Sequence, residues 1–140
     1  MSQVLRFNTN CSLDVIDIDF NREATIVNRE ISKLINCDYY TTFKPFFLLE
    51  LLKLQAYNYD VNKTGLLLLL DDDAPFKQNL DLNDFASVFA GSDVYGDCLL
   101  VGTKFRPEYE DFELCSVPED LRSRLERIYT KFKASNNGEG

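Results

Sequence analysis

The stretch Leu66–Phe105, LLLLLDDDAPFKQNLDLNDFASVFAGSDVYGDCLLVGTKF, decides the fold of this chain. The five leucines Leu66–Leu70 show no polar alternation, which is typical of a short central strand buried on both faces. Three aspartates follow and predict a solvated turn, and Asp81 is expected to cap a short helix that ends at Ala90. A second apolar strand, Asp97–Gly102, completes a unit that supplies the core of the protein.

Glycines mark the expected ends of these elements. Gly91 lies just past the short helix, where a left-handed residue ends many helices. Gly96 is expected to open the following strand and Gly102 to close it. The short helix carries four apolar side chains: Leu82, Phe85, Val88 and Phe89.

Alternating and periodic patterns predict further elements on both sides of this unit. Gln3–Asn8 and Leu13–Asp19 alternate apolar and polar residues, which predicts a strand hairpin. Asn28 is expected to cap a helix over Arg29–Asn36, because its side chain can accept from the free amides of the first turn. Two more strands are expected at Asp38–Phe43 and Asp111–Cys115.

The segment Phe46–Tyr57, FFLLELLKLQAY, favours a helix by its length and by its content of Leu, Glu, Lys and Gln. Two strands are the alternative. A helix would place Phe47, Leu48, Leu51 and Leu52 on one face. This segment is expected to belong to the core, although its apolar residues leave a contact in a homodimer open.

The last helix has the clearest signals. Ser116–Glu119 matches a capping box with Pro118 in the first turn. An apolar stripe at helical spacing follows: Leu121, Leu125, Ile128, Tyr129 and Phe132. The sequence therefore predicts one α+β domain over residues 1–133, with a mainly antiparallel sheet, packed helices and a C-terminal amphipathic helix. Residues 134–140 are small and polar and predict a flexible tail.

Composition excludes several classes of function. The chain has 140 residues and a net charge of −8, which disfavours direct binding to nucleic acid because that requires clustered Lys and Arg. It has no histidine, the commonest general base and metal ligand. The four cysteines are widely spaced, which favours free thiols and no zinc site. The N-terminus lacks a signal pattern and no apolar run would span a membrane, so a cytoplasmic protein is expected.

Two groups of charged residues are candidate binding sites. The first is an acidic protein-binding surface made of Asp71, Asp72, Asp73, Asp81 and Asp84. The second, an alternative, is an anion site on the last helix made of Arg122, Arg124, Arg127 and Lys131. Neither the spacing of a calcium-binding loop nor a glycine-rich phosphate loop is present, so no metal, cofactor or catalytic residue is expected.

Several stretches resemble a family of small proteins of unknown function from phages and mobile elements. The matching stretches are Val4–Asp19, Asn28–Asn36, Leu66–Asp73, Leu80–Asn83 with Ala86–Ser87, Tyr95–Gly102 and Asp111–Phe132. The chain departs from the family by carrying extra residues from Phe43 to Thr64. Members tend to occur near genes that counter host restriction, and the resemblance therefore implies a role in antagonising host defence.

Together these observations predict a non-enzymatic acidic binding protein that acts on a host defence protein by occlusion or by mimicry of nucleic acid. A protein that binds or sequesters a nucleotide is the alternative function. An enzyme that uses carboxylates and a metal is the third.

Overall fold

The computed structural model describes residues 1–137, which fold into one six-stranded sheet and four α-helices. The elements, in chain order, are β1 (Ser2–Phe7), β2 (Leu13–Ile18), α1 (Ala24–Leu34), β3 (Tyr40–Phe43), α2 (Phe46–Leu52), β4 (Gly65–Asp71), the 3-10 turn η1 (Ala74–Phe76), α3 (Asp84–Ala90), β5 (Cys98–Arg106), the 3-10 turn η2 (Pro107–Tyr109), β6 (Asp111–Cys115) and α4 (Glu119–Asn137). The predicted α+β class and all six predicted strands are confirmed.

Every pairing in the sheet is antiparallel, as predicted, and the main strand order is β2-β1-β5-β4-β3. One edge of β5 carries two partners in succession. Its first half pairs with β1, where Leu100 lies opposite Leu5, and its second half pairs with β6, where Lys104 lies opposite Glu113. The long strand β5 therefore joins both ends of the chain into one sheet.

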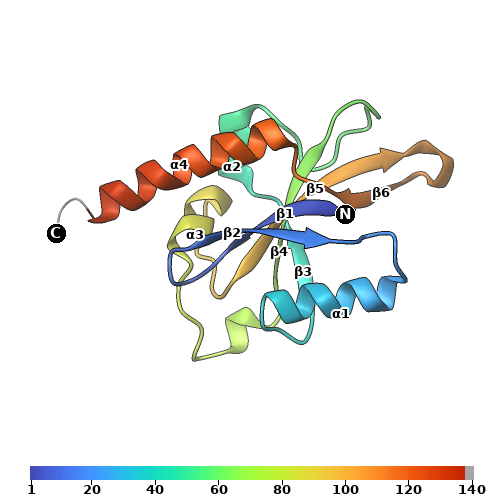
Figure 1. Ribbon diagram of the computed structural model, residues 1–140. Helices are drawn as coiled ribbons and strands as arrows, with labels where there is room; N and C mark the ends of the chain where they lie inside the picture. Colours follow the sequence, from blue (N-terminus) through green and yellow to red (C-terminus); the bar gives the residue numbers. More distant parts are fainter. Residues whose placement is uncertain (138–140) are drawn as a thin grey trace.

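Helices cover the two faces of the sheet unequally. In Figure 1, α1 lies against one face and α2, α3 and α4 lie on the opposite side, with the end of α4 projecting beyond the sheet. Residues Val27, Ile31 and Ile35 are the buried residues by which the α1 segment joins the core. On the other face, the Phe85 ring packs 5.1 Å from that of Phe7 and 5.0 Å from that of Tyr129.

The run of leucines in β4 behaves as predicted. Leu66–Leu69 are at most 2% exposed because both faces of this inner strand are covered. Gly91 has a φ of 78° and ends α3 in the left-handed conformation, as expected. Gly102, however, does not close β5, which continues to Arg106. Gly102 instead lies against the backbone of Ser116, and a Cβ at Gly102 would be 2.2 Å from the carbonyl oxygen of Ser116.

The predicted caps of α1 and α3 are wrong. Helix α1 begins at Ala24, so Asn28 lies inside it, and its Oδ1 accepts a hydrogen bond from the Tyr40 hydroxyl. The buried residue Val27 extends the apolar stripe of α1 upstream, and this packing places the start of the helix earlier than the asparagine suggests. Helix α3 is capped by Asn83, whose Oδ1 accepts from the amide of Ala86, and Asp81 lies outside the helix.

Asn83 replaces Asp81 as the cap because its side chain is also needed as a donor. Its Nδ2 donates to the carbonyl oxygens of Phe7 and Gly96, at 2.8 and 3.0 Å, and an ionised aspartate has no donor to offer. Asn83 is buried and connects three elements. Of the four apolar residues assigned to this helix, Phe85 and Phe89 are buried, whereas Leu82 and Val88 are exposed.

Helix α2 confirms the prediction of a helix from Phe46, but it ends at Leu52, with Lys53 in the left-handed conformation. The expected apolar face is wrong for Phe47 and Leu51, which are exposed together with Phe46. Helix α2 packs against α3 and instead buries Leu48, Leu49 and Leu52. The alternative of two strands is wrong for this part of the segment.

Helix α4 confirms the predicted amphipathic stripe. Leu121 and Leu125 are buried, and Ile128, Tyr129 and Phe132 pack against the core. The expected capping box is wrong: α4 begins at Glu119, after Ser116 and Pro118, and the Ser116 hydroxyl instead accepts a hydrogen bond from the amide of Gln3, 3.0 Å away. The helix continues through Asn137, so residues 134–137 of the predicted tail are helical, and residues 138–140 lie outside the described part of the chain. None of the helices in residues 1–137 has the length and apolar character needed to cross a membrane.

Candidate functional site

The structure separates Asp71 from the other predicted acidic residues. Its side chain is 4% exposed, at the end of β4, and its Oδ2 accepts a hydrogen bond from the Lys77 ammonium group, 2.5 Å away. Its Oδ1 accepts from the amide of Asp73 at 2.9 Å. The assignment of Asp71 to a contact surface is therefore wrong, because the residue serves to hold the following loop. This hydrogen bond, with the charges of Asp71 and Asp38, raises the pKa of Lys77.

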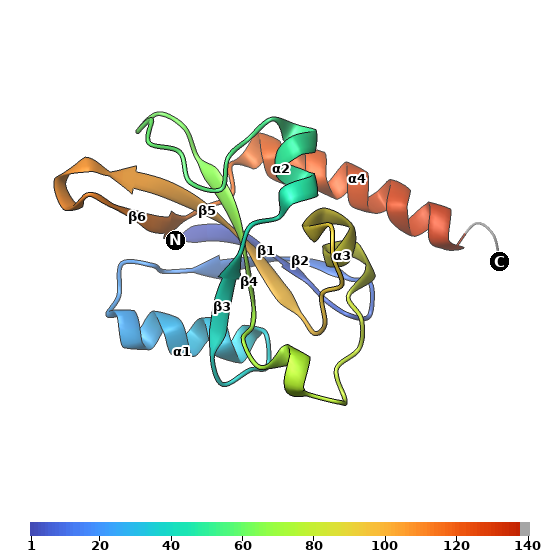
Figure 2. The same ribbon diagram turned by 180° about the vertical axis from the view of Figure 1, so that it is seen from behind.

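The other predicted acidic residues lie along one end of the sheet. Asp72 and Asp73 begin the loop after β4, and Asp81 and Asp84 lie at the start of α3 (Figure 2). Between them, in η1, the Phe76 side chain is 85% exposed. We call Asp72, Asp73, Phe76, Asp81 and Asp84 the acidic end.

The segment that contains the acidic end, residues 71–97, accounts for most of the net charge of the protein. Residues 71–97 contain seven aspartates and one lysine, a net charge of −6 out of −8 for the whole chain. The lysine is Lys77, and it is paired with the buried Asp71. The exposed aspartates of this segment therefore have no cation of their own segment to neutralise them.

The structure also separates one residue of the predicted basic site, Arg122, from the other three. Arg122 is tied to the N-terminal strand, since its guanidinium group donates to the Val117 carbonyl oxygen and to the Gln3 side chain. Arg124, Arg127 and Lys131 do come together, around a shallow hollow beside Ile128. All the residues that line this hollow belong to α4, so no second element faces the three cations.

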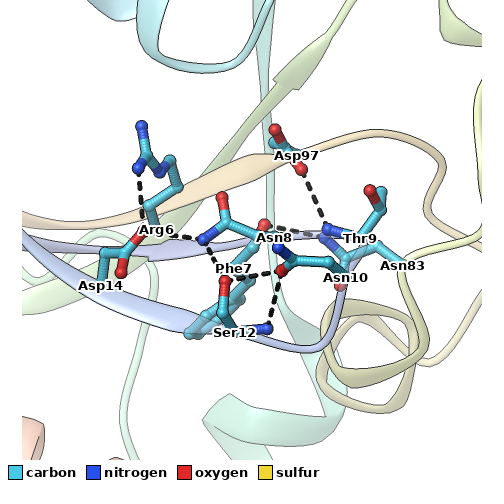
Figure 3. Close-up of polar contacts among 9 residues, drawn as sticks. All are labelled: Arg6, Phe7, Asn8, Thr9, Asn10, Ser12, Asp14, Asn83 and Asp97. Atoms are coloured by element: carbon cyan, nitrogen blue, oxygen red, sulfur yellow. Dashed lines mark hydrogen bonds and ion pairs between the residues drawn. The ribbon is translucent and has the colours of Figure 1, made fainter.

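A polar network lies at the turn between β1 and β2 (Figure 3). Asn8 donates to Ser12 and Asp14, Arg6 donates to Asp14, and the Asp97 carboxylate accepts from the amide of Thr9. The hydrogen bonds from Arg6 and Asn8 lower the pKa of Asp14. Within residues 1–135, Arg6 Nε is the only buried side-chain nitrogen or oxygen without a partner. The network therefore serves to fix the turn.

A hollow with a volume of about 860 Å³ lies between α1 and the start of β3. The α1 wall presents residues that can form hydrogen bonds at helical spacing: Thr25, Asn28, Arg29, Ser32 and Lys33. The opposite wall contains Cys37, Asp38, Tyr39 and Tyr40. We call this the α1–β3 hollow.

Two tyrosines give the α1–β3 hollow its aromatic wall. The Tyr40 hydroxyl donates to Asn28 Oδ1 at 2.6 Å and so ties the strand to the helix. Burial raises the pKa of Tyr40, which keeps this donor protonated at neutral pH. The Tyr39 side chain, in contrast, is 72% exposed.

Three thiols of the protein, those of Cys37, Cys98 and Cys115, are poorly suited to nucleophilic chemistry. Burial, with the charge of Asp71, raises the pKa of Cys37, and burial also raises those of Cys98 and Cys115. Since the thiolate is the nucleophile, these three groups are held in their unreactive form at neutral pH. Within the described residues, no cluster of three or more His, Cys, Asp or Glu side chains could hold a metal ion.

No protein-family model matches the chain, and comparisons with curated proteins and with solved structures find no match. The resemblance to a phage and mobile-element family stays a prediction.

Sequence analysis missed Phe76 and the whole α1–β3 hollow. Phe76 looks like a core residue in the sequence, and only its place in η1 exposes it. The polar stripe of α1 has the spacing of an ordinary solvated helix face, so its pattern gives no sign of the wall that Tyr39 and Tyr40 form opposite it.

Proposed function

We propose that this chain is a non-enzymatic binding protein that contacts a protein partner through its acidic end. The observation that carries the proposal is Phe76, a large aromatic side chain exposed at 85% on a loop rich in aspartate. Aromatic residues dominate the binding energy of many protein interfaces, whereas charged residues around them guide the encounter. The combination suits a partner with a basic rim around an apolar pocket.

The ion pair between the buried Asp71 and the exposed Lys77 supports this role. It fixes the residue that directly follows Phe76 to the end of β4, which limits the freedom of the loop before binding. A surface that is already ordered loses less conformational entropy when a partner binds. Binding through Phe76 would therefore cost little conformational entropy.

The biological setting of this proposal rests on the family resemblance. It supports a cytoplasmic protein of a phage or mobile element that occludes a host defence protein. The −6 charge of residues 71–97 is also compatible with mimicry of nucleic acid. The exposed Phe76 favours direct occlusion, because a phosphate backbone offers no aromatic anchor of this kind.

The chain offers a matched control for testing the acidic end. Tyr109 is 77% exposed in η2 and is flanked by Glu108 and Glu110, and η2 lies far from η1 in both ribbon views (Figures 1 and 2). We would capture partners from cell lysate with the wild-type protein, identify them, and measure binding kinetics with Phe76→Ala and Tyr109→Ala.

We expect Phe76→Ala to weaken the captured complex by roughly tenfold to a hundredfold, mainly through faster dissociation. Replacing Asp72 and Asp73 by Asn should slow association and reduce its dependence on salt. The Tyr109→Ala protein and a Glu108→Gln, Glu110→Gln double variant should bind like the wild type. Equal losses of affinity in the Phe76 and Tyr109 variants would show that the acidic end is not the contact surface.

A second candidate function is the sequestration of a small phosphate ligand on α4. The specific observation in its favour is the common hollow of Arg124, Arg127 and Lys131. An Arg124→Ala, Arg127→Ala double variant should then lose all stabilisation by nucleotides in a thermal-shift assay.

A further inference from the structure

We infer that the α1–β3 hollow is a binding site for a small phosphate ester that carries an aromatic ring, such as a nucleoside monophosphate. This inference is independent of the acidic end, because it concerns other residues and another class of ligand. Three separate observations support it: the charge of the α1 wall, the aromatic wall that faces it, and the size of the space between them.

The charge of the α1 wall selects an anion. Arg29 and Lys33 are four residues apart on α1, so they project from the same face of the helix. Among the salt bridges of the described residues, those of Arg6, Arg22, Lys77 and Arg106 all engage carboxylates, whereas Arg29 and Lys33 form none. In a chain of net charge −8, two adjacent cations without acidic partners form a local site for an anion.

The neutral groups beside these cations match a phosphate group. Thr25 and Ser32 bring hydroxyls and Asn28 brings an amide to the same wall. Phosphate oxygens accept hydrogen bonds from such groups, and a guanidinium group can bind two of the oxygens at once. A carboxylate ligand would use fewer of these donors.

The Tyr39 ring supplies the second half of the site. It lines the hollow at 72% exposure, so a face or edge of the ring is open to a ligand. Stacking of a base on an exposed aromatic ring is a common way to bind a nucleotide without reading its identity. Tyr40, which is fixed to Asn28, holds the neighbouring part of the wall in place.

The space and its surroundings allow such a ligand. A volume of about 860 Å³ lies within the usual range for sites that bind small molecules. Asp38 also lines the hollow and would repel a phosphate, but Asp38 shares an adjoining hollow with the cations Lys33 and Lys77. The negative charge of the acidic end is screened over about 8 Å at physiological salt, so the adjacent cations decide the local potential.

The test measures binding of AMP, GMP, adenosine and inorganic phosphate by calorimetry and by thermal shift. We expect at least one monophosphate to bind more tightly than either adenosine or inorganic phosphate, because only the nucleotide uses both walls. Replacing Arg29 and Lys33 together by Ala should weaken its binding about a hundredfold, since two charge-assisted hydrogen bonds are lost. These side chains are on the helix surface, so the variant should fold normally, which circular dichroism would check.

Matched variants distinguish this site from the alternative anion site on α4. Tyr39→Ala should weaken the nucleotide about tenfold and leave inorganic phosphate unchanged, whereas Tyr39→Phe should bind like the wild type. The Arg124→Ala, Arg127→Ala protein should also bind like the wild type. Loss of binding in that protein, or monophosphates that do not bind at all, would overturn the inference. Equal affinity for AMP and inorganic phosphate would overturn the role of Tyr39.

Discussion

The two faces of the sheet each carry a cluster of aromatic rings, but only one cluster is covered. Strand alternation places Phe7 and Phe105 on opposite faces, since Phe7 pairs with Cys98 and Phe105 is an odd number of residues further along β5. On the Phe7 face, Phe85 and Phe89 of α3 are buried against Phe7. On the Phe105 face, the rings remain partly exposed: Tyr57, Tyr59 and Phe112.

The difference follows from the number of helices on each face. Three helices cover the Phe7 face, whereas the other face has only α1. Beyond α1, an open groove of about 480 Å³ runs from Tyr40 to Phe112, and Tyr40 also lines the α1–β3 hollow. We conclude that the covered face supplies most of the stability and that the half-covered face has room for ligands.

The largest expected effect compares one ring from each face. Phe85→Ala should lower the free energy of unfolding by about 4 kcal/mol, because it leaves a cavity among four other rings. Phe112→Ala should cost about 1.5 kcal/mol, since its ring is only half-buried. Urea denaturation of both variants would measure the contrast. Similar losses would show that the two faces contribute equally and would contradict the comparison.

A second prediction concerns Asn83, which connects the covered face to the turn of the hairpin. Asn83→Ala should lower the free energy of unfolding by about 3 kcal/mol, because it removes a helix cap and leaves two buried carbonyl oxygens without their donor. Asn79→Ala, at an exposed position of the loop before α3, is the control and should change stability little. A cost below 1 kcal/mol would mean that water replaces the amide.

The smallest expected effect is on the dependence of stability on pH. Because Arg6 and Asn8 lower the pKa of Asp14 in the folded protein, the ionised carboxylate stabilises the fold above the pKa of the unfolded chain. This contribution disappears as the pH falls through the lower, folded value. Asp14→Asn should therefore cost about 0.5 kcal/mol at pH 7 and almost nothing near pH 2, as measured by urea denaturation at both values. A constant difference between the two proteins would point to packing instead.

The parts of the fold that sequence analysis predicted depend on local patterns. The leucines of β4, the stripe of α4 and the glycine after α3 each carry their signal within a few residues, and all three are confirmed. The predicted cap of α3 is wrong because the Asn83 side chain also bonds to the carbonyl oxygens of Phe7 in β1 and of Gly96 before β5, and no local pattern reveals these bonds.

The candidate sites were harder to predict for the same reason. Asp71 and Asp72 are adjacent residues of the same type, but only Asp71 is buried at the end of β4 and paired with Lys77. Arg122 differs from Arg124 in donating to Val117 and to Gln3, and Gln3 is more than a hundred residues away in the sequence. The α1–β3 hollow is formed by two segments, and the sequence pattern of α1 does not show that residues 37–40 lie beside it.

The attachment of β1 to the other end of the chain has a consequence for synthesis on the ribosome. Gln3 bonds with Ser116 and Val117, and Leu5 pairs with Leu100 in β5. The first strand therefore leaves the ribosome long before β5 and the start of α4, its partners from the second half of the chain, have been made. Until β5 and the start of α4 emerge, the hairpin of β1 and β2 has an unpaired edge and an uncovered apolar face, and this is the stage at which the nascent chain depends most on chaperones.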